Sequence, residues 1–200
     1  MSRIRRSGVV GIVRAGDPDT AREKATRLQD AGLPVLEISL TTPGALEVIR
    51  AAAARQVGIV GAGTVLNSRQ ATQVIEAGAQ VVVTPAFDGE VLQVAVENDV
   101  ACIPGCLTPT EMLNAMRLGA HAVKIFPAHL WSPEALAGLL EAMPELVCVP
   151  TGGVSPSSAP AWIQAGAAAV GVGSSLTSVG DTRTVVDSLL GSIAAVRSSG

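Results

Sequence analysis

Short apolar runs, mostly unbroken and rich in β-branched residues, recur along the whole 200-residue chain, and amphipathic, alanine-rich segments separate them. A strand covered by helices on both faces of a parallel sheet requires such a continuous run. The pattern therefore predicts an α/β fold in which strands and helices alternate. We expect strands at 9–13, 35–40, 58–61, 81–84, 101–104, 122–126, 146–150 and 168–172.

The segments between these runs carry the signals of helix ends. Asp17-Pro18 supplies an N-cap and a first-turn proline, and Ala31-Gly32 ends the same segment with a glycine that tolerates a left-handed backbone. A similar ending recurs at 77–78, 118–119 and 165–166. Each glycine precedes the next apolar run, as in a loop from a helix to a strand.

Eight strands in 200 residues give about 25 residues for each strand–helix unit. Right-handed units of this size close into a (β/α)₈ TIM barrel, which is typically roughly 250 residues long. A doubly wound open sheet is the alternative, but no Gly-x-Gly-x-x-Gly turn follows the first strand. No linker divides the chain, so we expect a single domain over residues 1–200.

Composition excludes several classes of protein. With 48% hydrophobic and 16% charged residues the chain is not disordered, and a net charge of −3 with 2% aromatic residues argues against a nucleic-acid partner. No apolar run reaches the length of about 18 residues that a transmembrane helix needs. We expect a soluble cytoplasmic protein without a membrane partner.

The cysteines predict no metal site. Cys102 and Cys106 have no histidine nearby at zinc-site spacing, and Cys148 makes the number odd. We expect reduced structural thiols and neither a metal nor another cofactor.

Two charged residues interrupt the apolar strands. Period-2 alternation directs Leu36 and Ile38 to the helix layer and Glu37 into the barrel, and it directs Lys124 into the barrel as well. Buried charges cost several kcal/mol unless they are paired, and these two have opposite signs. A structural salt bridge, or a register in which both side chains leave between the helices, would also explain them.

The scarcity of lysine favours a chemical role for Lys124. Of the 14 Lys and Arg residues only Lys24 and Lys124 are lysines, and Lys24 lies on the polar side of the first helix, an ordinary solvated position. Lysine, unlike arginine, can lose its proton and attack a carbonyl. With a carboxylate nearby, this pattern is typical of a Schiff-base lysine with an acid/base partner.

Segments rich in glycine and hydroxyl groups, 151–155 and 171–175, follow the seventh and eighth strands. Barrels bind phosphate at these positions, because glycines let backbone N–H groups approach an anion. Ordinary turn glycines would give the same pattern. Thr64 and Pro85 should shape the rim, and Arg14, at the end of the first strand, either binds a carboxylate or lies in solvent.

Six short motifs follow one another along the chain. They are Leu-Glu-Ile-Ser-Leu (36–40), Gly-Ala-Gly-Thr-Val (61–65), Ile-Pro-Gly (103–105), Lys-Ile-Phe-Pro-Ala (124–128), Pro-Thr-Gly-Gly-Val (150–154) and Gly-Val-Gly-Ser (171–174). Together they resemble the family of 2-keto-3-deoxy-6-phosphogluconate (KDPG) and 4-hydroxy-2-oxoglutarate (KHG) aldolases. The resemblance, over about residues 9–175, implies a metal-independent class I pyruvate aldolase, a lyase, on a barrel that assembles as a homotrimer.

The resemblance also implies roles for individual residues. Lys124 matches the Schiff-base lysine of the family, and Glu37 matches its acid/base carboxylate. Phe126 is the one aromatic residue expected near the site. The substrate-orienting positions fall on Thr64 and Thr151, and the distal phosphate site on Gly152, Gly153 and Ser174.

The sequence departs from the family pattern in two places. Many members carry an arginine for the substrate carboxylate where this chain has Thr41. Some relatives instead end the first strand with arginine, so we expect Arg14 to bind that carboxylate. Relatives also have an extra helix that plugs the barrel bottom, and residues 1–7 are too few for a comparable one.

The sequence leaves open which anionic group the substrate carries at the end far from its ketone. KDPG, which yields pyruvate and glyceraldehyde 3-phosphate, suits the glycine-rich segments, but the same N–H groups could bind the far carboxylate of KHG, which yields pyruvate and glyoxylate. Two other functions remain as alternatives. One is a phosphosugar isomerase with Glu37 as its base, and the other is a phospho-metabolite binding protein with a structural charge pair.

Overall fold

Strands and helices alternate in the computed structural model, which describes residues 2–177 and 181–198. The strands are β1 (Val9–Val13), β2 (Val35–Ser39), β3 (Ile59–Gly63), β4 (Val81–Val83), β5 (Ala101–Ile103), β6 (Gly105–Cys106), β7 (Val123–Ile125), β8 (Cys148–Pro150) and β9 (Val170–Val172). The helices are α1 (Ser2–Ser7), α2 (Pro18–Asp30), α3 (Ala45–Ala54), α4 (Ser68–Glu76), α5 (Gly89–Glu97), α6 (Pro109–Arg117), α7 (Pro133–Ala142), α8 (Ala159–Gln164) and α9 (Thr182–Ser198), with the 3₁₀ helices η1 (Ala128–Leu130) and η2 (Ser174–Leu176).

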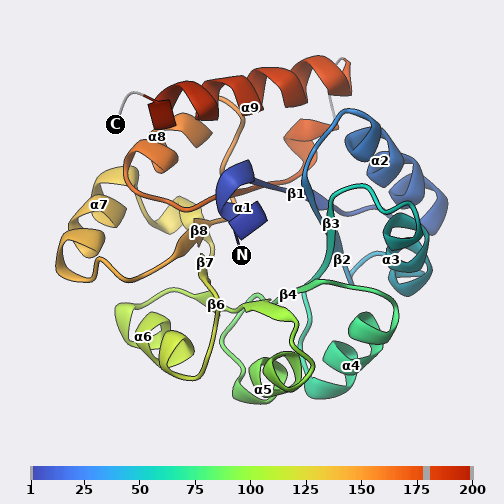
Figure 1. Ribbon diagram of the computed structural model, residues 1–200, viewed down its shortest axis with the longest axis horizontal. Helices are drawn as coiled ribbons and strands as arrows, with labels where there is room; N and C mark the ends of the chain where they lie inside the picture. Colours follow the sequence, from blue (N-terminus) through green and yellow to red (C-terminus); the bar gives the residue numbers. More distant parts are fainter. Residues whose placement is uncertain (1, 178–180, 199–200) are drawn as a thin grey trace.

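The strands form a closed parallel ring, with helices α2 to α9 outside it and α1 over its axis (Figure 1). Pairing runs in the order β5-β4-β3-β2-β1-β9, and a second ladder joins β6, β7 and β8. A bridge between Thr151 and Gly171 links the end of β8 to β9, and Lys124 donates its N–H to the Pro104 carbonyl (2.8 Å), which links β7 to the residue between β5 and β6. The predicted (β/α)₈ barrel is therefore confirmed, and the doubly wound sheet is excluded.

The observed strands differ from the predicted ones mainly at their ends. β1 has the predicted bounds, whereas β3 continues to Gly63, beyond the predicted end at residue 61. The predicted strand 101–104 is interrupted at Pro104, which has no N–H to donate to a ladder, and pairing resumes over β6.

The helix ends follow the predicted signals. The Asp17 side chain accepts a hydrogen bond from the Thr20 N–H (2.8 Å), and Pro18 begins α2. Gly32, after α2, has a φ angle of +83°, a conformation that residues with side chains rarely adopt. Local residue chemistry therefore accounts for where this helix begins and ends.

Buried apolar side chains form two clusters. The larger lies between the strands and the helices and includes Leu36 and Ile38, as alternation along β2 predicts. The smaller lies inside the barrel. Its members Val35 and Ala122 precede Glu37 and Lys124 by two positions, so this cluster forms a floor beneath the two charged side chains. This floor consists of Val10, Val35, Val81, Val83, Ile103, Ala122, Val147, Val149 and Ala169, completed by Ile4.

The helix α1 bears on one prediction. Residues 2–7 do form a short helix, and it lies over the barrel axis in Figure 1. Its Ile4 side chain is fully buried in the interior cluster. Residues 1–7 were expected to be too few for a helix comparable to the plug of the relatives, yet this short helix does close the barrel end, because one large apolar side chain is enough to complete the floor.

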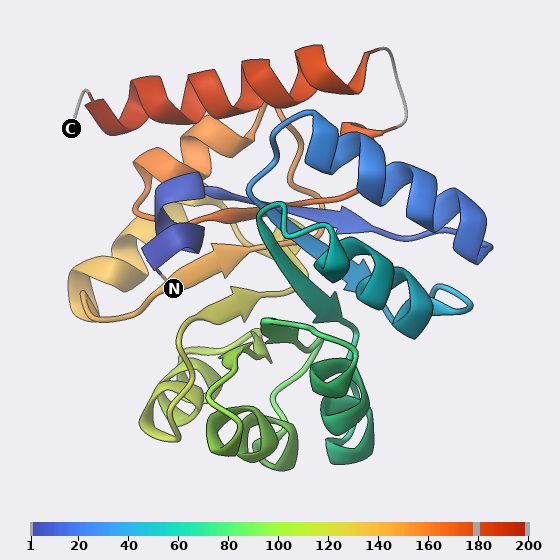
Figure 2. The same cartoon turned by 45° about the vertical axis from the view of Figure 1, so that its right-hand side comes forward.

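The helix α9 covers the seam at which the barrel closes. It is 17 residues long and packs beside α8 and α2 (Figures 1 and 2). Since α2 belongs to the first strand–helix unit and α9 to the last, this packing joins the two ends of the described chain.

The cysteines are structural, as predicted. Cys102, Cys106 and Cys148 are buried free thiols, and burial raises the pKa of each to about 12, so they are protonated at neutral pH. Within residues 2–177 and 181–198 no group of three or more His, Cys, Asp or Glu residues is placed to hold a metal ion. None of the helices described is long and apolar enough to cross a membrane.

Candidate active site

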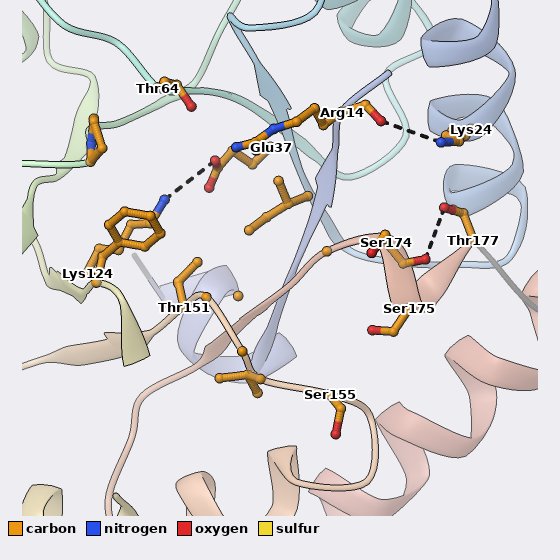
Figure 3. A pocket seen from close by; sticks show the side chains of 18 residues that line it. Arg14, Lys24, Glu37, Thr64, Lys124, Thr151, Ser155, Ser174, Ser175 and Thr177 are labelled. Carbon is orange, nitrogen blue, oxygen red and sulfur yellow. Dashed lines mark hydrogen bonds and ion pairs between the residues drawn. The ribbon is translucent and has the colours of Figure 1, made fainter. Parts of the chain in front are cut away.

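A cavity of about 550 Å³ opens where the carboxyl ends of the strands meet their loops (Figure 3). Barrel enzymes carry their reactive groups at this end, because the loops of all units converge there. All ten residues that the sequence predicts for the site line this cavity: Arg14, Glu37, Thr64, Pro85, Lys124, Phe126, Thr151, Gly152, Gly153 and Ser174.

Lys124 of β7 and Glu37 of β2 meet inside the barrel. Lys124 Nζ and Glu37 Oε1 are 3.7 Å apart, and the two side chains are only 7% and 5% exposed. Lys124 Nζ also lies 5.0 Å from the centroid of the Phe126 ring. The predicted inward orientation is confirmed, and the alternative register in which both side chains leave between the helices is wrong.

Two strand glycines make room for side chains of the site. A Cβ atom on Gly63 of β3 would lie 2.6 Å from Glu37 Cγ and still closer to the carboxyl group. A Cβ atom on Gly171 of β9 would lie 2.7 Å from Thr151 Cγ2 and closer still to the hydroxyl. Atoms cannot approach this closely, so the absence of a side chain at each glycine lets Glu37 and Thr151 occupy their observed positions.

Thr64 has a strained backbone. Its φ angle is +61°, which is a genuine outlier for a β-branched residue and costs about 1–3 kcal/mol. The Ser39 hydroxyl lies 3.0 Å from Thr64 Oγ1 and 2.8 Å from Thr41 Oγ1. Thr64 lines the cavity but Thr41 does not, and Arg14 is the only arginine of the described residues that lines it. Arg14 is therefore the guanidinium available to a substrate carboxylate.

The loops after β8 and β9 form one wall of the cavity, as predicted. Gly152 and Gly153 have φ angles of +88° and +92°, and a Cβ atom on Gly152 would lie 3.1 Å from the Phe126 ring. Ser174 begins η2 at the end of the second loop. This wall offers backbone and hydroxyl groups, which suit an anion or a sugar hydroxyl.

Three residues of the cavity were not predicted, namely Ile12, Lys24 and Thr177. Alternation along β1 places Ile12 on the same side as Arg14, so the position of Ile12 in the cavity could have been predicted from the sequence. The prediction that Lys24 lies in solvent is wrong, because Lys24 is half-buried and donates a long hydrogen bond (3.5 Å) to the Arg14 carbonyl oxygen (Figure 3). The scarcity of lysine, which drew attention to Lys124, applied equally to Lys24. Both lysines of the chain line this one cavity.

The cavity carries an excess of positive charge. Arg14, Lys24 and Lys124 line it, and Glu37 is its only carboxylate among the described residues. Glu37 pairs with Lys124, and neither of the other two cations has a described carboxylate within 4.0 Å. A buried amine beside a carboxylate, together with two cations that form no ion pair with a described carboxylate, suits a carbonyl compound with two anionic groups.

Comparison with known proteins agrees with this chemistry. The sequence profile described as "KDPG and KHG aldolase" matches residues 1–187. The chain is 36% identical over 177 residues to the 2-dehydro-3-deoxy-6-phosphogalactonate aldolase of Escherichia coli (strain K12), covering 87% of this chain and 86% of that protein. It is 37% identical over 153 residues to the KHG/KDPG aldolase of the same strain, covering 75% and 71%.

A solved structure has the same fold. The structure of the 2-keto-3-deoxy-6-phosphogluconate aldolase of Zymomonas mobilis ZM4 with 3-phosphoglycerate matches this chain with a TM-score of 0.83 at 28% identity. The match covers 98% of this chain and 94% of the other. The similarity therefore extends over the whole barrel.

Proposed function

Because the chain belongs to the KDPG and KHG aldolase family, and is thus a lyase, we propose that it cleaves a 2-keto-4-hydroxy acid through a Schiff base on Lys124. The observation that carries this proposal is the buried Lys124–Glu37 pair, with 3.7 Å between the amine and the carboxylate, at the edge of a cavity large enough for a sugar acid. Family membership favours the aldolase over an isomerase or a binding protein.

The proposed reaction begins when the Lys124 amine adds to the C2 carbonyl and water leaves, which forms an iminium ion. Glu37 then takes the proton of the C4 hydroxyl as the C3–C4 bond breaks and the aldehyde departs. The electron pair of that bond moves into the iminium and gives an enamine. Glu37 returns the proton to C3, and water hydrolyses the resulting imine to pyruvate and the free amine.

We propose KDPG as the preferred substrate. The Zymomonas mobilis relative is named for KDPG, whereas the first Escherichia coli relative is named for the phosphogalactonate analogue, which differs in the configuration at C4. The second Escherichia coli relative is named for both KHG and KDPG. Values of kcat/KM for all three compounds, measured on one preparation, decide among them, and a KDPG value below either of the others rejects this choice.

Trapping with borohydride tests the Schiff base. The protein is incubated with pyruvate, reduced with sodium borohydride and digested, and the modified peptide is identified by mass spectrometry. We expect one adduct, on Lys124, and the chain's only other lysine, Lys24, provides an internal control in the same digest. If Lys124 stays unmodified under conditions in which the enzyme is fully active, the proposed Schiff base is refuted.

Arg14→Ala is expected to weaken binding of the pyruvyl carboxylate. Arg14 is the only arginine among the described residues of the cavity, and loss of a charge-assisted hydrogen bond costs about 1.5–3 kcal/mol, or roughly 10- to 150-fold in affinity. The KM for pyruvate in the condensation direction should rise by this factor with a smaller change in kcat. A pyruvate KM equal to that of the wild type would refute the assignment.

Gly63→Ala is expected to displace Glu37 and to lower kcat about 100-fold, since a misplacement of about 1 Å at a reacting group has this effect. The matched control is Gly138→Ala, because a Cβ atom on that glycine of α7 meets nothing within 4 Å. The control should retain full turnover. Steady-state kinetics with circular dichroism on both variants checks the prediction, and a fully active Gly63→Ala enzyme would show that the carboxylate position is not critical.

A homotrimeric assembly and a cytoplasmic location remain predictions. Light scattering on the purified protein measures the first directly.

A further inference from the structure

Among the described residues of the cavity, Lys24 is the one charged side chain that the proposed reaction does not use. It extends from α2 toward the end of β1, on the side of the cavity where Ser174 and Thr177 lie and away from Lys124 (Figure 3). Its ammonium group has three N–H donors, and the Arg14 carbonyl accepts one of them over a long 3.5 Å contact. Donors therefore remain for a ligand.

Lys24 has no ion-pair partner among the described acidic side chains. Within the described part of the chain no carboxylate lies within 4.0 Å of its Nζ atom. Asp17, the N-cap of the same helix, accepts hydrogen bonds from both the N–H and the hydroxyl of Thr20, and its charge interacts with Lys24 only from beyond 4.0 Å. A half-buried cation that faces a cavity and forms no close ion pair favours an anion from solution.

The position of Lys24 separates it from the pyruvyl half of the substrate. The C1 carboxylate is bonded to C2, which binds Lys124, so that carboxylate must lie beside Lys124. The Arg14 side chain extends toward Glu37 in Figure 3 and can reach that region, whereas Lys24 lies at the other side of the cavity. The two unpaired cations thus match two anionic groups at opposite ends of one molecule.

We propose that Lys24 binds the anionic group at the far end of the substrate, and that its charge sets the preference for substrates ionised at both ends. This inference rests on the proposed aldolase function. A lysine ammonium suits this position, because its point charge on a flexible stem can bind either a tetrahedral phosphate or a planar carboxylate.

The test compares Lys24→Gln with the wild type on three substrates: KDPG, the same compound without its phosphate, and KHG, whose far group is a carboxylate. We expect kcat/KM for KDPG to fall at least tenfold, mainly through KM, with a change of less than twofold for the unphosphorylated compound. A loss with KDPG alone assigns Lys24 to phosphate, and a loss with both KDPG and KHG assigns it to either anion. Lys24→Arg should recover part of the loss.

Arg22→Gln is the matched control. It removes one positive charge from the same helix, where Arg22 is exposed and paired with Asp19, so all three substrates should keep their wild-type values. An unchanged KDPG value in Lys24→Gln, or an equal loss with the unphosphorylated compound, overturns the inference. If wild-type protein forms no pyruvate adduct, the aldolase proposal itself fails, so the two failures are distinguishable.

Discussion

Lys124→Arg is expected to lower kcat/KM for KDPG by about 10⁴-fold or more and to abolish the borohydride-trapped pyruvate adduct. Arginine keeps a positive charge opposite Glu37, 3.7 Å away in the wild type, but it does not give up a proton and cannot form a Schiff base. The variant thus separates nucleophilic chemistry from charge. Turnover with KDPG and mass spectrometry after reduction measure both effects.

Arginine is the preferred replacement for Lys124 because it keeps a positive charge beside the buried Glu37 carboxylate and so preserves the fold. Lys124→Met would leave the Glu37 carboxylate buried without its partner, and breaking a buried pair in this way costs up to roughly 3–5 kcal/mol of unfolding free energy. A loss of activity in that variant could then reflect unfolding. If folded Lys124→Arg protein retains activity within tenfold of the wild type, Lys124 is not the nucleophile.

Glu37→Gln is expected to lower kcat by about 10²–10⁴-fold while pyruvate is still trapped on Lys124. The amide has nearly the shape of the carboxylate but cannot take the proton of the C4 hydroxyl. Because the amine remains in place, imine formation and bond cleavage should respond differently to this change. Single-turnover cleavage of KDPG, run beside reductive trapping with pyruvate, measures the two steps separately.

Glu37→Asp is the companion variant for Glu37→Gln. It keeps a carboxylate but shortens the side chain by one methylene, so part of the activity should return. Loss of trapping in folded Glu37→Gln protein would contradict the assignment, because Glu37 would then be needed for the Schiff base itself. Equal activities of the Asp and Gln variants would show that position, rather than proton transfer, limits the reaction.

Local patterns in the sequence account for much of this fold. Each strand is a short apolar run that must be covered on both faces, and each predicted helix end carries its own cap or glycine, as at Asp17 and Gly32. Alternation along one strand is also a local pattern, and it predicts on its own that Glu37 and Lys124 point into the barrel, where they do meet.

Other features depend on contacts between distant segments. Lys24 looked solvated because helix periodicity gives only its face on α2, whereas its place in the cavity depends on how α2 packs after β1. Gly63 belongs to the 61–65 motif, but nothing in its neighbourhood along the chain shows that the Glu37 side chain fills the space beside it. Ile4 likewise completes a floor built from seven other segments.

The sequence by itself determined the repeating strand–helix unit, the inward direction of the two charged side chains and the chemical types of the site residues. These follow from the period of the backbone and from the chemistry of single residues. Only the tertiary structure decided that Glu37 and Lys124, 87 positions apart, stand 3.7 Å from each other and that Lys24 faces the same cavity. Closure of the ring sets these distances, because it brings the carboxyl ends of all strands to one opening.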